Sequence, residues 1–285
     1  MSFSPQRTGR TTEGSGITRI IFAAVLTLLF CFMTWQKANA QTSGAPRHAQ
    51  SQQELDDYRA ATARNGGAAL EQAAIAFAQK YPQSELRTYL FSKAMRQYQR
   101  ENNANGMLAM GQGVLAIEPS DPQALVLTAT VMADSLAPED PDRERKINGI
   151  KRNISRALQI LSTKPAGAPQ GQTPLYRSTL ESMAYATQGL MRLKTGDYAE
   201  AENDLKTSLE RASSHPDPFV WYHLALAQDH RRKYPAALNS VEQALQLASA
   251  SPELQKLAET EHERLLRLTG RSKEPSEAGS THPPD

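Results

Sequence analysis

Cysteine is nearly absent: the 285 residues include only Cys31, which lies in an apolar run near the N-terminus. Because we interpret that run as part of an export signal, we expect no cysteine in the mature chain. This excludes disulfide scaffolds, zinc–thiolate sites and cysteine nucleophiles from the mature protein. His223 and His230 lie two helical turns apart on one face, but a zinc site needs three or four ligands. No further histidine has suitable spacing, so we expect neither a metal nor a cofactor.

Catalytic motifs and an excess of charge are also absent. The sequence has no G-x-S-x-G turn, no glycine-rich phosphate loop and no H-E-x-x-H pair, so we expect no catalytic residue and no enzyme. It carries 32 lysines and arginines against 30 acidic residues, and removing residues 1–40 leaves 28 against 29. A nearly neutral mature chain argues against general binding to nucleic acid or another polyanion. A local basic run occurs at Arg231, Arg232 and Lys233. We interpret it as a solvated turn, and phosphate binding is the alternative.

The first forty residues have the pattern of a secretory signal peptide. A basic segment ends at Arg19, an apolar run extends from Ile20 to Met33, and Ala38-Asn39-Ala40 supplies an A-x-A exit. The run is shorter than the ~20 residues of a membrane-spanning helix, so we predict cleavage after residue 40. An exported chain without cysteine fits a bacterial periplasm or cell envelope. Retention of the leader as an anchor is the alternative.

The rest of the mature sequence is typical of helices. Ala, Leu, Gln, Glu, Lys and Arg dominate, and apolar residues recur every three or four positions. Even the strand-like stretch 125–131 follows a capped proline, so we interpret it as a buried helix. Ser51 and Glu54 predict a capping box, and four further pairs predict helix N-termini because a capping side chain precedes proline. These pairs are Asp121-Pro122, Thr173-Pro174, Asp217-Pro218 and Ser251-Pro252.

Two segments repeat each other at a spacing of 36 residues. The matching pairs are Tyr185 and Trp221, Tyr198 and Tyr234, Ala201 and Ala237, and Ser208 and Ala244. Each segment predicts a helix, a tight turn that ends at an aromatic residue, and a second helix. Small residues allow the two helices to approach closely. A single hairpin of this kind cannot bury its apolar face, so it must stack on its neighbours.

The repeated unit resembles a tetratricopeptide repeat (TPR). That pattern runs W-x2-L-G-x2-Y in the first helix, Gly and Tyr at the turn, and A-x3-F-x2-A in the second helix. The last copy matches at Trp221, Leu224, Ala225, Tyr234, Ala237, Val241 and Ala244, and the copy before it matches at Tyr185, Gly189, Gly196, Tyr198, Ala201, Leu205 and Ser208. Weaker copies cover 55–82, 91–119 and 125–158, and the last of these contains about nine inserted residues around 137–146.

The resemblance implies an all-α fold, a right-handed α-solenoid of about five TPR-like hairpins with a C-terminal capping helix. We expect a signal peptide at 1–40, a linker at 41–50, the repeat domain at 51–268 and a disordered tail at 269–285. Within the repeat domain we expect units at about 51–85, 86–119, 120–164, 173–214 and 215–250, and the capping helix at 252–268.

TPR proteins usually bind an extended peptide or a partner helix in a groove lined by the first helix of each unit. The resemblance implies that Trp221 is a core residue and that the groove carries Tyr89, Ser92, Arg96, Gln99, Arg100, Leu190, Lys194, Tyr222, Leu226, Asp229 and His230. Binding of an acidic chain terminus is not implied, because Ser92 and Arg96 replace the Lys and Asn of the family's carboxylate clamp.

These expectations lead to one leading hypothesis and two alternatives. The leading hypothesis is an exported, non-catalytic TPR scaffold that binds another protein or peptide segment through the concave groove. It implies no nucleic-acid partner and no stable membrane span once the signal is cleaved. The first alternative is an envelope-assembly or secretion accessory protein anchored by an uncleaved leader. The second is a solenoid that binds a small ligand or glycan.

Overall fold

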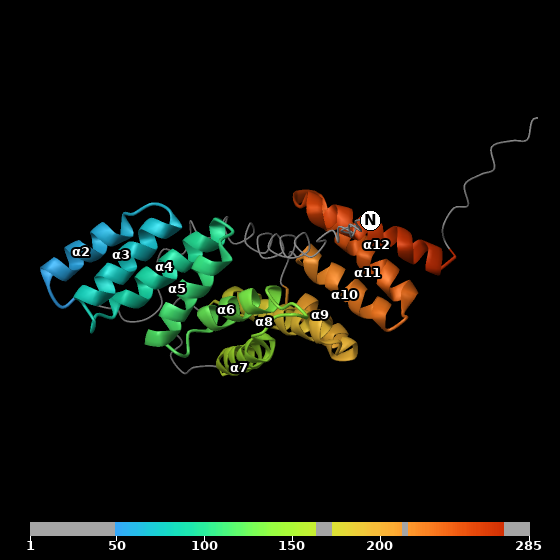
Figure 1. The fold of residues 1–285 in the computed structure, drawn as a ribbon, viewed down its shortest axis with the longest axis horizontal. Helices are drawn as coiled ribbons and strands as arrows, with labels where there is room; N and C mark the ends of the chain where they lie inside the picture. Colours follow the sequence, from blue (N-terminus) through green and yellow to red (C-terminus); the bar gives the residue numbers. More distant parts are fainter. Residues whose placement is uncertain (1–48, 164–172, 213–215, 271–285) are drawn as a thin grey trace, which may run out of the picture. The chain divides into compact units, whose positions relative to one another are not determined.

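The structure, a computed structural model, describes residues 49–163, 173–212 and 216–270. Within these ranges all regular structure is helical (Figure 1): eleven α-helices and one short 3-10 helix, with no strand. The all-α prediction is therefore confirmed for the described residues. The predicted signal peptide, the linker up to residue 48 and the tail from residue 271 lie outside them.

The chain divides into two compact units, residues 1–172 and 173–285. The N-terminal unit contains three helical hairpins, and each of its helices packs against the next one along the chain. In addition, α2 contacts α4, so the first helices of neighbouring hairpins lie side by side as in a TPR stack. The hairpins are α2 (Gln52–Thr62) with α3 (Gly67–Lys80), α4 (Leu86–Arg100) with α5 (Ala104–Ile117), and α6 (Pro122–Asp134) with α7 (Arg143–Ser162).

The C-terminal unit contains two hairpins and a final helix. Consecutive helices again pack together, α10 also contacts α8, and α12 covers α11 as the capping helix. The elements are α8 (Pro174–Thr195), α9 (Tyr198–Arg211), α10 (Pro218–His230), α11 (Tyr234–Leu247), the 3-10 helix η1 (Ala248–Ala250) and α12 (Pro252–Leu268). Five TPR-like hairpins and a capping helix are thus present across the two units.

The predicted helix N-caps are confirmed at all four prolines. The side chains of Asp121, Thr173, Asp217 and Ser251 each accept a hydrogen bond from a backbone N–H in the first turn, at 2.7, 3.2, 2.9 and 3.4 Å. The same geometry occurs at Ser51, whose Oγ accepts from the Glu54 amide at 3.1 Å. The reciprocal bond of the capping box differs from the prediction, because the Glu54 carboxylate accepts from the amide of Gln50 rather than that of Ser51.

Residues 125–131 form the middle of α6, as expected, and not a strand. Nearly every side chain between 124 and 131 is buried, because α6 packs against α5 on one side and α7 on the other. A helix buried on most of its surface is apolar all round, and this makes its sequence look like a strand. The insertion around 137–146 forms turns up to residue 142 and then begins α7, where Lys146 Nζ lies 2.6 Å from Asp140 Oδ2 of the turns.

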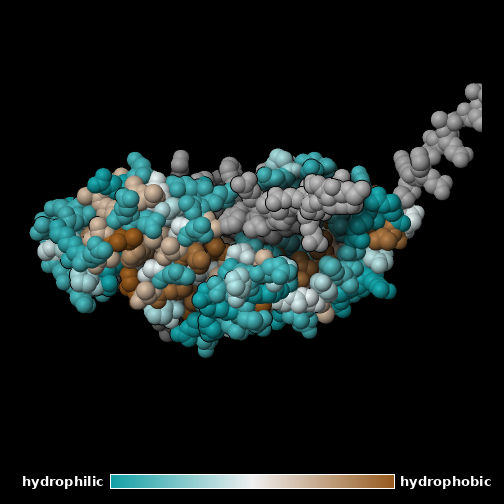
Figure 2. Space-filling model, in the orientation of Figure 1, coloured by the Kyte–Doolittle hydropathy of each residue, from teal (hydrophilic) through white to brown (hydrophobic). Residues whose placement is uncertain are grey.

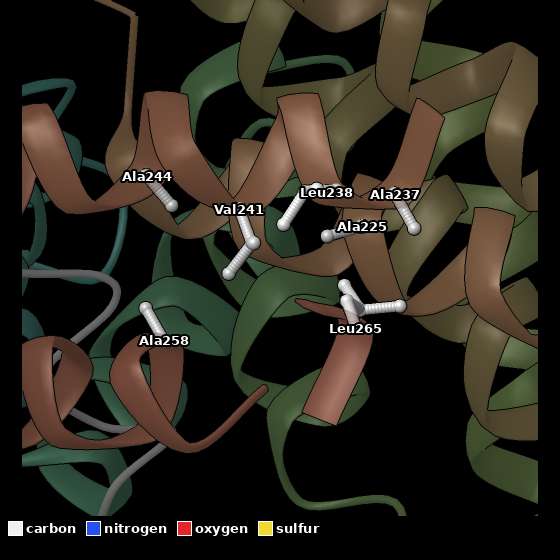
Figure 3. Packing of buried hydrophobic residues seen from close by; sticks show 7 residues of the cluster. All are labelled: Ala225, Ala237, Leu238, Val241, Ala244, Ala258 and Leu265. Carbon is white, nitrogen blue, oxygen red and sulfur yellow. The ribbon is translucent and has the colours of Figure 1, made fainter. Parts of the chain in front are cut away.

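Small side chains hold the C-terminal unit together, as the 36-residue repeat predicts. In Figure 3, Ala225, Ala237, Ala244 and Ala258 lie between α10, α11 and α12, with Leu238, Val241 and Leu265 filling the remaining space. In the preceding hairpin, a Cβ added at Gly189 would lie 2.6 Å from Cγ of Leu205, so only glycine allows α8 and α9 to approach this closely.

Candidate functional site

Three of the predicted groove residues share one face of α4 in the N-terminal unit. Tyr89, Ser92 and Arg96 are half-buried there, at the three- and four-residue spacing of a helix face. Tyr58 of α2 lies alongside: burial raises the pKa of Tyr58, as does the Tyr89 phenol, while Arg96 opposes this rise. We call Tyr58, Tyr89, Ser92 and Arg96 the α4 face.

The charge of Arg96 also affects the third hairpin. Burial raises the pKa of Asp121, the N-cap of α6, and the Arg96 guanidinium counteracts that rise. Arg96 therefore acts electrostatically on residues of both α2 and α6. The charge of Arg96 is thus felt in the hairpins that precede and follow its own in the chain.

The other two candidates on α4 point elsewhere. Gln99 is buried and lines a small pocket between α4, α5 and α6, together with Asn102, Met107 and Asp134 among others. Arg100 is exposed, and its Nε donates a 3.1 Å hydrogen bond to Gln97 on its own helix. The structure therefore brings together only three of the five residues predicted on α4.

In the C-terminal unit, the predicted groove residues contact other parts of the same unit. Tyr222 packs against the core formed with α12, and burial raises its pKa to about 12. Asp229 forms an ion pair with Arg264 of α12, with 2.6 Å between Oδ2 and Nη2. The His230 ring stacks on Tyr198 of α9, with centroids 4.1 Å apart and planes 3° from parallel. Trp221, expected in the core, is partly buried and packs against two hydrophobic clusters.

The remaining candidates differ in exposure. Leu190 is buried, whereas Lys194 and Leu226 are half-buried. Burial, together with the nearby Lys194 ammonium, lowers the pKa of His223 to about 4, so this imidazole is neutral at pH 7. A neutral imidazole such as that of His223 can ligate a metal. The other histidine of the predicted pair, His230, stacks on Tyr198. Within the described ranges, no group of three or more His, Cys, Asp or Glu residues could hold a metal ion.

The outer face of α3 and α5 is a feature that the sequence interpretation missed. The whole of α5 lacks a charged residue, and its exposed positions include Ala109, Gln112 and Ala116. On α3, the side chain of Ile75 is 40% exposed beside the exposed Ala76. Figure 2 shows apolar residues, in brown and tan, among the hydrophilic ones in this region. The absence of charge from 104 to 117 is a signal that could have revealed this face.

Comparisons with known proteins give a structural likeness only. No protein-family model matches the sequence, and no curated protein matches it. One similar solved structure is the crystal structure of a thermophilic TPR protein from Thermus thermophilus. It has 16% sequence identity and a TM-score of 0.46, and the match covers 73% of this chain and 98% of that chain. Among the described helices, none has both the length and the apolar composition required to cross a membrane.

Proposed function

We propose that this protein is an exported, non-catalytic helical-repeat scaffold that binds a segment of another protein on the α4 face. The observation that carries the proposal is the grouping of two tyrosines and an arginine, all half-buried, across the first helices of adjacent hairpins. Tyrosine and arginine are enriched at protein interfaces and supply much of their binding energy. Partly buried side chains also have less conformational entropy to lose on binding.

The C-terminal unit is the weaker candidate for the same role. Its Tyr222, Asp229 and His230 pack, pair or stack within the unit, as Tyr58 and Tyr89 also pack against the core of theirs. We assign partner binding to the N-terminal unit because the α4 face groups two tyrosines and an arginine from adjacent hairpins, whereas the predicted groove residues of the C-terminal unit include no arginine.

The test is capture of partners from cell-envelope extracts with matched variants of the mature chain. Arg96→Gln removes the charge from the α4 face, whereas Arg100→Gln removes the same charge from an exposed position on the same helix. We expect Arg96→Gln to weaken binding of each specific partner about tenfold, the effect of losing one charge-assisted hydrogen bond. Arg100→Gln should bind like the wild type.

A third variant, Ile75→Glu, places a charge on the outer face of α3. If Ile75→Glu abolishes capture and Arg96→Gln does not, the outer face is the binding surface and the groove assignment is wrong. Melting curves followed by circular dichroism control for loss of fold in each variant.

Export rests on the sequence of the leader and needs a separate measurement. We expect the exported protein to begin at Gln41 when its N-terminus is sequenced. A chain that begins at Met1 and sediments with membranes would instead support the anchored accessory protein and contradict cleavage.

A further inference from the structure

A buried carboxylate in the C-terminal unit collects three cationic side chains. Glu202 of α9 has a side chain only 2% exposed. Its carboxylate lies 2.7 Å from Lys206 Nζ, 2.9 Å from Lys233 Nζ and 2.5 Å from Arg231 Nη1. Lys206 is on α9, and the other two are in the turn between α10 and α11. A single carboxylate therefore positions three cations from two hairpins at one place.

The cluster carries more positive charge than Glu202 neutralises. Three cations contact this one anion, and the exposed Arg232 lies between Arg231 and Lys233 in the chain. Two acidic side chains of α9 and α10 pair elsewhere, Asp204 with Arg192 and Asp229 with Arg264. The side chains of Lys206, Arg231 and Lys233 are 49%, 31% and 43% exposed, so their charge remains accessible to solvent. We call Lys206, Arg231, Arg232 and Lys233 the basic turn.

The backbone of the basic turn has an unusual residue just after the end of α10. Arg232 has a left-handed conformation, with φ of +59°, which glycine adopts far more readily than arginine. The position 36 residues earlier is Gly196, with φ of +87°, so the preceding repeat has the expected residue. Asn102, the other non-glycine residue with positive φ among those described, is of a type that tolerates this region. Strained residues of this kind concentrate at binding sites.

The main chain of the turn is already satisfied. The amides of Arg231, Arg232 and Lys233 donate to carbonyl oxygens of α10, at Ala227, Asp229 and Gln228. Any anion at this place must therefore be held by side chains. Arginine can bind two oxygens of one phosphate at once, and lysine adds a point charge.

We propose that the basic turn is a binding site for a phosphomonoester or related phosphate dianion, either in a soluble molecule or in a lipid headgroup. Glu202 holds Lys206, Arg231 and Lys233 from the buried side, so their outer sides and Arg232 face the ligand together. The site lies in the C-terminal unit and does not depend on the α4 face. The near-neutral charge of the whole mature chain does not reveal it, because the excess is local.

The test is calorimetric titration of the full chain with inorganic pyrophosphate at constant ionic strength, and the key variant is Arg232→Gly. Glycine relieves the left-handed strain, so this variant should melt at a higher temperature than the wild type while binding pyrophosphate about tenfold more weakly. Weaker binding by a more stable protein cannot be attributed to loss of fold. Lys256→Gln removes one charge from an exposed position on α12 and should leave binding unchanged.

Vesicles distinguish the two sources of phosphate. The first source is a lipid headgroup. It is identified if the wild type co-sediments with phosphatidylcholine vesicles that contain phosphatidic acid and Arg232→Gly does not. Binding to pyrophosphate without binding to these vesicles identifies a soluble ligand. If the wild type binds neither, if Arg232→Gly binds as well as the wild type, or if Lys256→Gln weakens binding equally, the proposal is wrong.

Discussion

Two buried carboxylates, two residues apart on α9, have opposite electrostatic environments. Burial by itself raises the pKa of Glu202, but hydrogen bonds from Lys206 and Lys233 outweigh it and lower the pKa to about 2. Asp204 pairs with Arg192, with 2.9 Å between Oδ2 and Nη1. Here the effect of burial is larger than that of the arginine, so the pKa of Asp204 rises to about 6. Glu202 therefore stabilises the fold above its ordinary pKa, and this contribution is lost as the pH falls toward 2.

Asp204 has the opposite pH dependence, which a single variant can reveal. Because its pKa of about 6 lies above the ordinary 3.8, its stabilising contribution is complete below about pH 4 and is lost as the pH rises through 6. We expect Asp204→Asn to raise the free energy of unfolding at pH 7 by about 1 kcal/mol and to have little effect at pH 4. Urea denaturation at the two pH values measures this. A variant less stable than the wild type at pH 7 would show that the ion pair with Arg192 dominates.

His223 provides a second prediction at the residue scale. With a pKa lowered to about 4 by burial and Lys194, this imidazole stays neutral in the folded protein until the pH is well below 6.5. Its contribution to stability is therefore present above pH 6.5 and decreases as the pH falls toward 4. Titration of the imidazole C–H resonances by NMR should show one histidine with a midpoint near pH 4. The resonance of this histidine should be missing from the spectrum of His223→Gln. A midpoint near 6.5 for His223 would contradict the burial of this side chain.

At the scale of helices, local chemistry sets where each element begins. The caps before Pro122, Pro174, Pro218 and Pro252 involve residues close together in the chain, so they could be predicted from sequence alone. The same holds for the repeat of small residues at 36-residue spacing. By contrast, the direction of Gln99 toward α5 and α6 depends on how the second and third hairpins pack, which no local pattern contains.

The N-cap of α6 is suited to a test at this scale. Asp121 Oδ1 accepts a hydrogen bond from the Ala124 amide at 2.7 Å, and Asp121→Ala removes it, which should lower the free energy of unfolding by about 1 kcal/mol. Asp121→Asn keeps an oxygen at the same place and should be nearly as stable as the wild type. Thermal unfolding of the two variants gives the comparison. Equal loss in both would mean that the charge, and not the hydrogen bond, stabilises the helix.

At the scale of the whole molecule, the chain consists of two compact units that meet in the sequence between residues 172 and 173. The C-terminal unit has hydrophobic clusters of its own, which combine α9 with α10 and α10 with α11 and α12. In a repeat protein, stability comes from such contacts between neighbours.

We therefore expect residues 171–285 to fold without the N-terminal unit. The fragment retains Thr173, the cap of α8, and all the described helices from α8 to α12. Its circular dichroism spectrum should be helical, and it should unfold cooperatively at a temperature where the full chain shows a transition. A fragment without helical signal would show that the C-terminal unit requires the first three hairpins.

The sequence alone determined the helical class, the helix starts and the hairpin repeat, because each depends on residues near one another in the chain or on a constant spacing. Only the tertiary structure decided what the polar side chains do. Asp229 and His230, which the resemblance places in the groove, contact Arg264 and Tyr198, which are 35 and 32 residues away in the chain. Likewise, Glu202 joins Arg231 and Lys233 only because packing of α9 against α10 brings the two hairpins together. Pairing of charges depends on distances in space, and spacing along one helix does not specify them.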